Sequence, residues 1–148
     1  MNVRRGDFRI STDPTRLDLD VIHGFLERSY WAEGTPREVV ERSIQHSLCF
    51  GLYEGDRQVG FARVVTDRAT YAYLADVFVI ESHRARGLAT WLVQTILDHP
   101  DLQGLRRWSL ATRDAHDLYR KVGFTGLAHP ERHMEKSKPG IYTQEVHS

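Results

Sequence analysis

The segment best suited to chemistry is a strand-like stretch that runs through a short turn directly into a helix. Residues 76–80 are mostly apolar, and an apolar helical stripe follows the turn. The first turn of a helix exposes unpaired N–H groups and about half a positive charge, so it attracts anions. Gly87 and Ala89 let a phosphate approach the backbone, and Arg84 and Arg86 add cationic donors. The pattern favours a pyrophosphate site, but glycine and surface arginine also suit a turn that serves the fold alone.

Two motifs resemble the signatures of the GNAT family of N-acetyltransferases. The first, Arg84-x-x-Gly87-x-Ala89, is similar to the family's acetyl-CoA signature Gln/Arg-x-x-Gly-x-Gly/Ala. The second, Ala115-x-x-Leu118-Tyr119-x-Lys121-x-Gly123-Phe124, stands at the separation and on the helix that the family requires. The expected order of elements agrees from Phe8 to Lys136, so the resemblance covers nearly the whole chain.

Three positions depart from the common family pattern. Ala89 replaces a more frequent glycine, Glu81 a proline and Thr112 an asparagine. None of them removes a group that acetyl transfer requires, although Thr112 affects how the end of the cofactor is held.

The resemblance implies acetyl-CoA as cosubstrate, in a V-shaped opening between the strands expected at 71–80 and 105–111. Backbone groups of Phe78 and Val79 would bond to the pantetheine amides in the manner of an added strand. The backbone amides expected to hold the pyrophosphate are those of Arg84, Ala85, Arg86, Gly87, Leu88, Ala89 and Thr90.

Direct acetyl transfer needs a neutral amine, a site for the tetrahedral oxyanion and a proton for the leaving thiolate. In the family motif, Tyr119 is the expected proton donor, because a phenol pKa near ~10 lies close to a thiol pKa near ~8.5. Without the motif, Tyr119 reads as an aromatic of an amphipathic helix. Asp76, in a central strand, is either a base that acts through water or a hydrogen-bonded structural acid, and the sequence leaves both open.

Aromatic residues near the first two expected helices suggest an acceptor site. In the family this helix pair lines the acceptor side of the opening, which makes Tyr30 and Trp31 candidates for an acceptor wall. Tyr73 and Phe50 raise the same question. Aromatic walls favour an apolar or aromatic amine over a highly charged polyamine. Alternatively, these side chains cover the sheet edge.

Other reactive residues point away from metal and thiol chemistry. His129 and His133 have the spacing of a metal pair on a helix, but Pro130 disfavours helix there and no third ligand is evident, so we expect no metal. Cys49 lies in an apolar strand segment without a paired histidine, where a free cysteine acts as a small core residue.

The remaining sequence predicts a mixed α/β sheet, mostly antiparallel and flanked by helices. Helices are expected at 19–29, capped by Asp18, and from Thr35 to 46, with Thr35 as a capping hydroxyl. A third covers 88–97, and a short fourth is capped by Asp114 and stopped by Gly123. The expected strands are 8–11, 48–53, 58–66, 71–80, 105–111, 124–127 and 133–136.

Length and charge limit the function classes. The 148 residues predict one domain, spanning 1–148. Twenty Lys and Arg balance twenty Asp and Glu, so no overall field attracts nucleic acid or an anionic membrane. Mean hydropathy is −0.47 and no apolar run is long enough to span a membrane. The expected compartment is the reducing cytoplasm.

The sequence thus predicts an acetyl-CoA-dependent N-acetyltransferase that acts on a primary amine, in a ternary complex, with a small-molecule acceptor. The alternative is a non-catalytic acyl-CoA sensor or partner-binding module. The expected partners are acetyl-CoA and the amine, with no nucleic acid or membrane, and a homodimer is an open alternative to a monomer.

Overall fold

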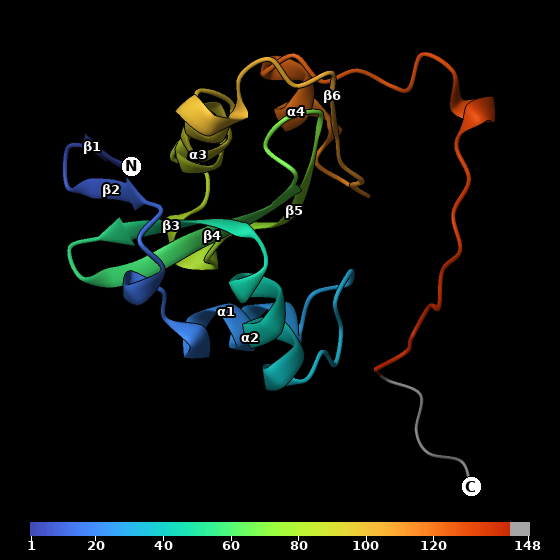
Figure 1. The fold of residues 1–148 in the computed structure, drawn as a ribbon. Coiled ribbons are helices and arrows are strands. Elements are labelled where there is room, and N and C mark those ends of the chain that lie inside the picture. The colour runs from blue at the N-terminus through green and yellow to red at the C-terminus, as the bar shows by residue number, and fades with distance from the viewer. Residues whose placement is uncertain (143–148) are drawn as a thin grey trace, which may run out of the picture.

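The computed structural model describes residues 1–142, which build one six-stranded sheet with helices on both faces (Figure 1). The strands are β1 (Asn2–Arg5), β2 (Phe8–Ser11), β3 (Leu48–Glu54), β4 (Arg57–Thr66), β5 (Tyr71–Val79) and β6 (Arg107–Ser109). The helices are α1 (Leu19–Leu26), α2 (Arg37–Gln45), α3 (Leu88–Leu97) and α4 (His116–Lys121). Short 3-10 turns cover Pro14–Arg16, Glu81–His83, Pro100–Leu102 and Pro130–Arg132.

The strands follow one another across the sheet in chain order, from β1 to β6. Strands β1 to β5 pair antiparallel. The β3–β4 connection shows why, since Glu54 pairs with Arg57 across a turn that is too short for a crossover. Strand β6 pairs parallel with β5, after a crossover that contains α3. The mixed, mostly antiparallel α/β sheet that the sequence predicts is therefore confirmed.

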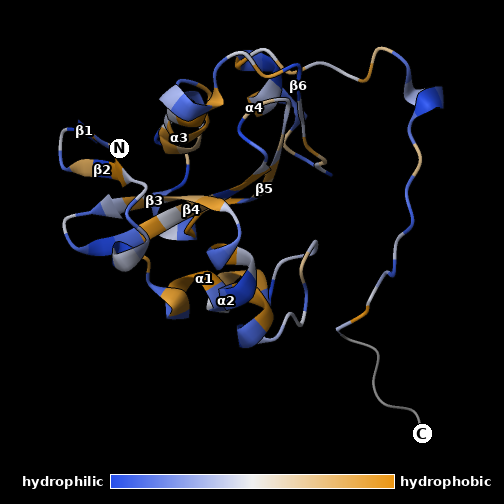
Figure 2. Ribbon diagram, in the orientation of Figure 1, coloured by the Kyte–Doolittle hydropathy of each residue, from blue (hydrophilic) through white to orange (hydrophobic). Residues whose placement is uncertain are grey.

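Two apolar layers hold the helices to the sheet. Helices α1 and α2 lie on one face and α3 and α4 on the other (Figure 1). On the first face, Ile22 and Leu26 pack with Phe61 and Phe78, and all four are buried. The second layer is larger and contains the buried side of α3. Figure 2 shows hydrophobic residues on the elements that meet in these layers, whereas the C-terminal part of the chain is mostly hydrophilic.

Capping was predicted correctly for one helix and wrongly for two. The Asp18 carboxylate accepts hydrogen bonds from the N–H groups of residues 20 and 21, as expected at the start of α1. Helix α2 begins after Pro36 without a side-chain cap, because the Thr35 hydroxyl donates instead to the Ala32 carbonyl at 2.6 Å. Helix α4 follows Ala115, again without a side-chain cap, so the Asp114 assignment is wrong.

The two ends of the chain also differ from expectation. Strand β1 was not predicted, because its arginine-rich sequence has no apolar alternation, yet it pairs with β2 along its whole length. The expected strands at 124–127 and 133–136 are absent from the described residues. Residues 124–142, here called the C-terminal arm, leave the body beyond α4 and run beside it (Figure 1). Many of residues 122–133 line a cavity together with Arg107 and Trp108 of β6, but no strand pairing forms between them in the described part of the chain.

No helix within residues 1–142 is long and apolar enough to cross a membrane.

Two glycines should respond in opposite ways to the same substitution. A Cβ on Gly60 would stand 2.9 Å from both the Phe78 carbonyl oxygen and Leu52 Cδ2, whereas a Cβ on Gly24 in α1 meets nothing within 4 Å. We expect Gly60→Ala to lower the free energy of unfolding by about 1–3 kcal/mol through overpacking. Gly24→Ala should raise it by about 0.5–1 kcal/mol, because alanine favours helix. Urea denaturation measures both, and shifts of the same sign would contradict this account.

Candidate active site

The centre of the site is a bulge in β5. Phe61 pairs with Phe78 and Arg63 with Ala75, so two residues of β5 face one residue of β4 between these pairs. Within the bulge Asp76 has a φ of 56°, a left-handed conformation that Asp tolerates better than most residues. The bulge changes the direction of β5 and breaks the regular alternation of its side chains.

Beyond the first residues of β5, the sheet opens. Strand β6 pairs only with Tyr71, Ala72 and Tyr73, so no other strand among residues 1–142 lies beside the rest of that edge of β5. A cavity of about 730 Å³ lies at this opening. Its lining includes Tyr30, Trp31, Tyr73, Asp76, Arg113 and Tyr119. The V-shaped opening expected between these two strands is thus present, although β6 is shorter than predicted.

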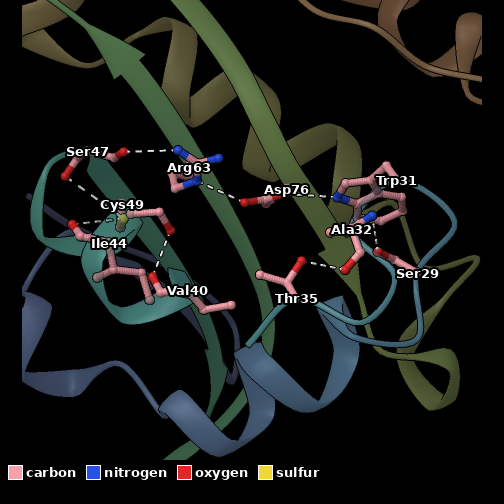
Figure 3. A network of polar contacts seen from close by, with 11 residues as sticks. Ser29, Trp31, Ala32, Thr35, Val40, Ile44, Ser47, Cys49, Arg63 and Asp76 are labelled. Atoms are coloured by element: carbon pink, nitrogen blue, oxygen red, sulfur yellow. Dashed lines mark hydrogen bonds and ion pairs between the residues drawn. The ribbon is translucent and has the colours of Figure 1, made fainter. Parts of the chain in front are cut away.

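The Asp76 carboxylate joins three elements of the structure (Figure 3). One oxygen accepts a hydrogen bond from Trp31 Nε1 at 2.9 Å, and the other accepts from Arg63 Nε at 2.8 Å. Arg63 Nη1 also donates to Ser47 Oγ at 3.2 Å. The Asp76 side chain is only 11% exposed, so these donors offset the cost of burying its carboxylate. Each oxygen of the carboxylate therefore already has a partner.

Tyr30 and Trp31 lie together on one side of the cavity, tied to both of its edges. Trp31 is bound to Asp76 on β5, as described above. The Tyr30 hydroxyl accepts from the Arg113 backbone N–H at 3.0 Å, and the Arg113 guanidinium lies 3.8 Å from the centre of the Tyr30 ring. The segment that follows α1 thus spans the opening from β5 to the loop after β6. Tyr73 lines the same cavity, whereas Phe50 is buried in the α3 layer and belongs to the core.

The segment that carries these aromatic residues is braced by its own hydrogen bonds. Ser29 Oγ donates to the Leu26 carbonyl at 2.7 Å and accepts from the Ala32 N–H at 3.1 Å. The Thr35 hydroxyl holds the Ala32 carbonyl, as Figure 3 shows. Short polar side chains therefore replace regular secondary structure here and keep the aromatic wall in place.

Tyr119 enters the cavity from α4. The side chain is 9% exposed, and its ring packs edge-on against Phe124. Its hydroxyl makes no hydrogen bond with another residue that the structure describes. Burial raises the pKa of Tyr119 to about 12, and nearby Tyr30 and Asp114 add to the rise. Tyr119 thus presents a protonated hydroxyl that is available to a bound molecule.

The turn before α3 contains left-handed residues and leads into a helix without a side-chain cap. Gly87 is the N-terminal cap of α3 with a φ of 75°, and Ala85 is also left-handed, with a φ of 62°. Leu88 is buried and anchors the turn, whereas residues 84–87 are exposed. One detail was not expected: Arg84 Nε donates to the Val79 carbonyl at 3.2 Å.

Sequence reasoning missed three residues that organise the site. Arg63 pairs with Asp76, and its only signal was a charge between apolar residues of a strand. Arg113 holds Tyr30 and gave no signal. His83 is 5% exposed and lies 3.0 Å from Glu54 Oε1 through Nε2, which ties the turn before α3 to the end of β3. These contacts join residues far apart in the chain, so no local pattern reveals them.

The two histidines with the spacing of a metal pair have other neighbours. His129 Nδ1 lies 3.4 Å from Glu131, and His133 Nε2 lies 3.4 Å from Arg107 Nη1. Among residues 1–142, no three His, Cys, Asp or Glu side chains form a group that could hold a metal ion.

Comparison with known proteins agrees with this geometry. The sequence profile of the family described as "Acetyltransferase (GNAT) family" matches residues 18–124. The chain belongs to the GNAT acetyltransferase family. The matched part contains every cavity residue named above and excludes most of the C-terminal arm.

Individual relatives support the same assignment. A Gibberella zeae protein described as a "putative acetyltransferase" is 34% identical over 143 residues, covering 81% of this chain and 80% of that protein. A crystal structure of a GNAT-family protein from Xanthomonas campestris, also described as a "putative acetyltransferase", is 50% identical with a TM-score of 0.90, and the match covers 92% of this chain and 96% of that one. A Clostridium acetobutylicum predicted acetyltransferase with acetyl-CoA has the same fold at 13% identity and a TM-score of 0.63, covering 88% and 94% of the two chains.

The buried tyrosine of this GNAT protein should make its stability fall at high pH. The pKa of Tyr119 is raised from 10.0 to about 12, so the unfolded chain releases this proton before the folded one does. The stabilisation is complete below pH 10 and is lost as the pH rises from 10 to about 12. Each such group contributes a slope of about 1.4 kcal/mol per pH unit in this window. Burial also raises the pKa of Tyr53 and of the Cys49 thiol to about 12 and raises that of Tyr73, so these groups add to the slope.

Tyr119→Phe should make the loss of stability between pH 10 and about 12 less steep, by the contribution of one group, about 1.4 kcal/mol per pH unit. Urea denaturation through this pH range, for wild type and variant, measures the difference. Parallel curves for the two proteins would show that Tyr119 titrates in the same way whether the chain is folded or unfolded.

Proposed function

We propose that this protein transfers the acetyl group of acetyl-CoA to the primary amine of a small molecule, by direct attack within a ternary complex. The observation that carries the proposal is the unpartnered Tyr119 hydroxyl, which lines a cavity at the point where β5 and β6 separate. A protonated hydroxyl beside an open strand edge provides both a docking surface for an extended cosubstrate and a donor for its leaving sulfur.

Acetyl-CoA would lie along the open edge of β5 and end at the turn before α3. Backbone groups of Phe78 and Val79 would pair with the pantetheine amides, as an added strand does. The Val79 carbonyl already accepts from Arg84, so the Arg84 side chain must release it for that carbonyl to accept from the cosubstrate. Freed in this way, Arg84 would turn to the pyrophosphate together with Arg86.

The pyrophosphate would be held chiefly by backbone N–H groups of residues 84–90. Left-handed residues 85 and 87 shape this turn, and no side chain caps the helix that follows. Its free amides and the helix dipole both favour a negative charge.

In the reaction, the amine nitrogen attacks the thioester carbonyl carbon. A C–N bond forms, the C–S bond breaks, and the amine loses its surplus proton to water. Tyr119 would donate a hydrogen bond to the departing sulfur. Because its pKa is about 12 and that of a free thiol is near ~8.5, the phenol stabilises the thiolate as a donor more than by full proton transfer.

For Asp76 the contacts support a positioning role. Its two oxygens are held by Trp31 and Arg63, so a base role would require one of these donors to give way to a water molecule. We therefore propose that Asp76 holds Trp31 against the cavity and that the amine reaches its neutral form by exchange with solvent.

The acceptor would bind against Tyr30, Trp31 and Tyr73. These side chains are 43%, 42% and 36% exposed and line the cavity, whose volume of about 730 Å³ suits a small molecule. Three aromatic surfaces favour an amine that carries an apolar or aromatic group. A screen of amines with acetyl-CoA, read by release of free thiol, tests the activity. Acetyl-CoA binding without turnover on any amine would instead support a sensor.

A charge placed in the turn should abolish acetyl-CoA binding. Gly87→Glu puts a carboxylate where the pyrophosphate is expected, so we predict at least a ~100-fold loss of affinity, equal to about 2.7 kcal/mol. Gly104→Glu is a matched control, because both glycines have a φ of 75° and open space around a Cβ. Calorimetric titration of acetyl-CoA into each folded variant measures the effect. Equal affinities of the two variants would refute the assignment of the turn.

Removing the Tyr119 hydroxyl should slow turnover and leave binding intact. We predict that Tyr119→Phe lowers kcat by about 10²–10³-fold, the usual effect of losing one donor to a developing charge. Tyr53→Phe is the control, because Tyr53 is also buried, its hydroxyl also has no partner, and it lies outside the cavity. Steady-state turnover is measured with one responsive amine, beside acetyl-CoA binding. Unchanged kcat in Tyr119→Phe would remove the assigned role.

A further inference from the structure

One primary amine of the chain itself lies at the cavity proposed for the acceptor. The chain has three lysines, at positions 121, 136 and 138. Lys138 lines the cavity of about 730 Å³, whereas Lys121 and Lys136 are not part of its lining. The proposed donor Tyr119 lines the same cavity. An amine and the group that would assist its acetylation therefore share one space.

The C-terminal arm brings Lys138 to this place. It leaves the body beyond α4, passes β6 at His133 and reaches the level of α1 and α2 (Figure 1). Residues 137–142 then line the cavity together with Tyr30 and Trp31. The family profile ends at residue 124, so this wall of the cavity lies outside the part of the chain that the profile matches.

The residues after Lys138 restrict the backbone that carries it. Pro139 follows directly, and a residue before proline is largely confined to extended conformations. Residues 139–142 form a turn in which Gly140 has a φ of 67°, as proline followed by glycine favours. Proline also limits the freedom of the unfolded arm, so less conformational entropy is lost when Lys138 is held at the cavity.

Apolar contacts and charge both favour this position of the arm. Ile141 and Tyr142 also line the cavity and are 48% and 42% exposed, so about half of each residue is covered. Without Lys138 the lining contains three carboxylates and two arginines, and the lysine makes the charges equal. Two of these carboxylates, Glu33 and Asp114, form no ion pair with another described residue, so they are free to attract an ammonium group.

We propose that the chain acetylates itself at Lys138, whose side-chain amine occupies the acceptor site and takes the acetyl group from acetyl-CoA bound along β5. This inference rests on the proposed function. Lys138 is exposed, so its ammonium group can lose a proton to solvent and become the neutral nucleophile. The Lys138 stem is aliphatic and suits the aromatic surfaces of Tyr30 and Trp31.

The transfer follows the steps given above for a free amine. Lys138 Nζ attacks the thioester carbonyl carbon, a C–N bond forms, and the C–S bond breaks with its electron pair on sulfur. The surplus proton on nitrogen passes to water, and Tyr119 donates a hydrogen bond to the departing thiolate. The product is a neutral amide that cannot react again, so the reaction stops at one acetyl group per chain.

Mass spectrometry of the full-length protein incubated with acetyl-CoA tests the proposal, with peptide mapping to follow each lysine. We expect Lys138 to be acetylated at least ~100-fold faster than Lys136, because Lys136 meets acetyl-CoA only by random encounter. Lys138→Arg should abolish the fast acetylation, and Lys136→Arg, the matched control in the same arm, should leave it unchanged. Equal rates at the two lysines would overturn the proposal.

Two further measurements identify where the transfer takes place. At saturating acetyl-CoA, the fraction of Lys138 acetylated per unit time should stay constant over a ~100-fold dilution of the protein, because donor and acceptor belong to one chain. A rate that rises with protein concentration would overturn transfer within the chain. Tyr119→Phe should slow acetylation of Lys138 by about 10²–10³-fold and leave that of Lys136 unchanged. Equal slowing at both, or at neither, would contradict the use of this site.

Failure of this proposal and failure of the proposed activity give different results. Release of free thiol with an added amine, without acetylation of Lys138, would overturn only the inference about the arm. Absence of thiol release with every amine, together with an unmodified Lys138, would overturn both.

Discussion

The ion pair between Arg63 and Asp76 is the interaction on which the site depends. It joins β4 and β5 at the bulge, where Asp76 adopts a left-handed conformation that costs roughly 1–2 kcal/mol for an L-residue. The Arg63 guanidinium and the Trp31 indole together provide hydrogen-bond donors for both oxygens of a nearly buried carboxylate. Without them the bulge would contain an unpaired charge, and the segment after α1 would lose its attachment to the sheet.

The bulge at Asp76 also explains why the sheet opens between β5 and β6. A bulge bends its strand and strengthens the local twist, so β5 turns away from the line along which β6 approaches it. Strand β6 pairs over three residues and then separates, and the cavity occupies the space between them. Tyr30 and Trp31 span that space, each held by a hydrogen bond to a different edge. The same break in regular pairing thus makes both an open strand edge and a walled cavity.

Buried layers position the cavity, and exposed segments surround it. The cavity is backed by two apolar layers, each with a buried centre surrounded by partly buried residues, which keep the strands and α4 in place. Exposed segments lie at the periphery: no side chain caps the start of α3, and residues 137–142 of the C-terminal arm line the cavity. Burial also affects Tyr119 itself. It raises the pKa of this side chain to about 12, so the phenol stays protonated near neutral pH.

What the sequence determined was local. The turn around Gly87, the cap at Asp18, the helical stripe of α3 and the hairpins of β3 to β5 follow from glycine conformation, capping chemistry and hydrophobic period, and each depends on a few neighbouring residues. Tyr119 was found for the same reason, as part of a continuous motif. The tertiary structure alone decided the partners of Asp76, the role of Arg113 beside Tyr30, the shortness of β6 and the unpaired state of the arm. These features depend on which distant segments meet, and a strand exists only where another edge completes its hydrogen bonds, so local propensity could neither supply the contacts of Asp76 nor make strands of residues 124–127 and 133–136.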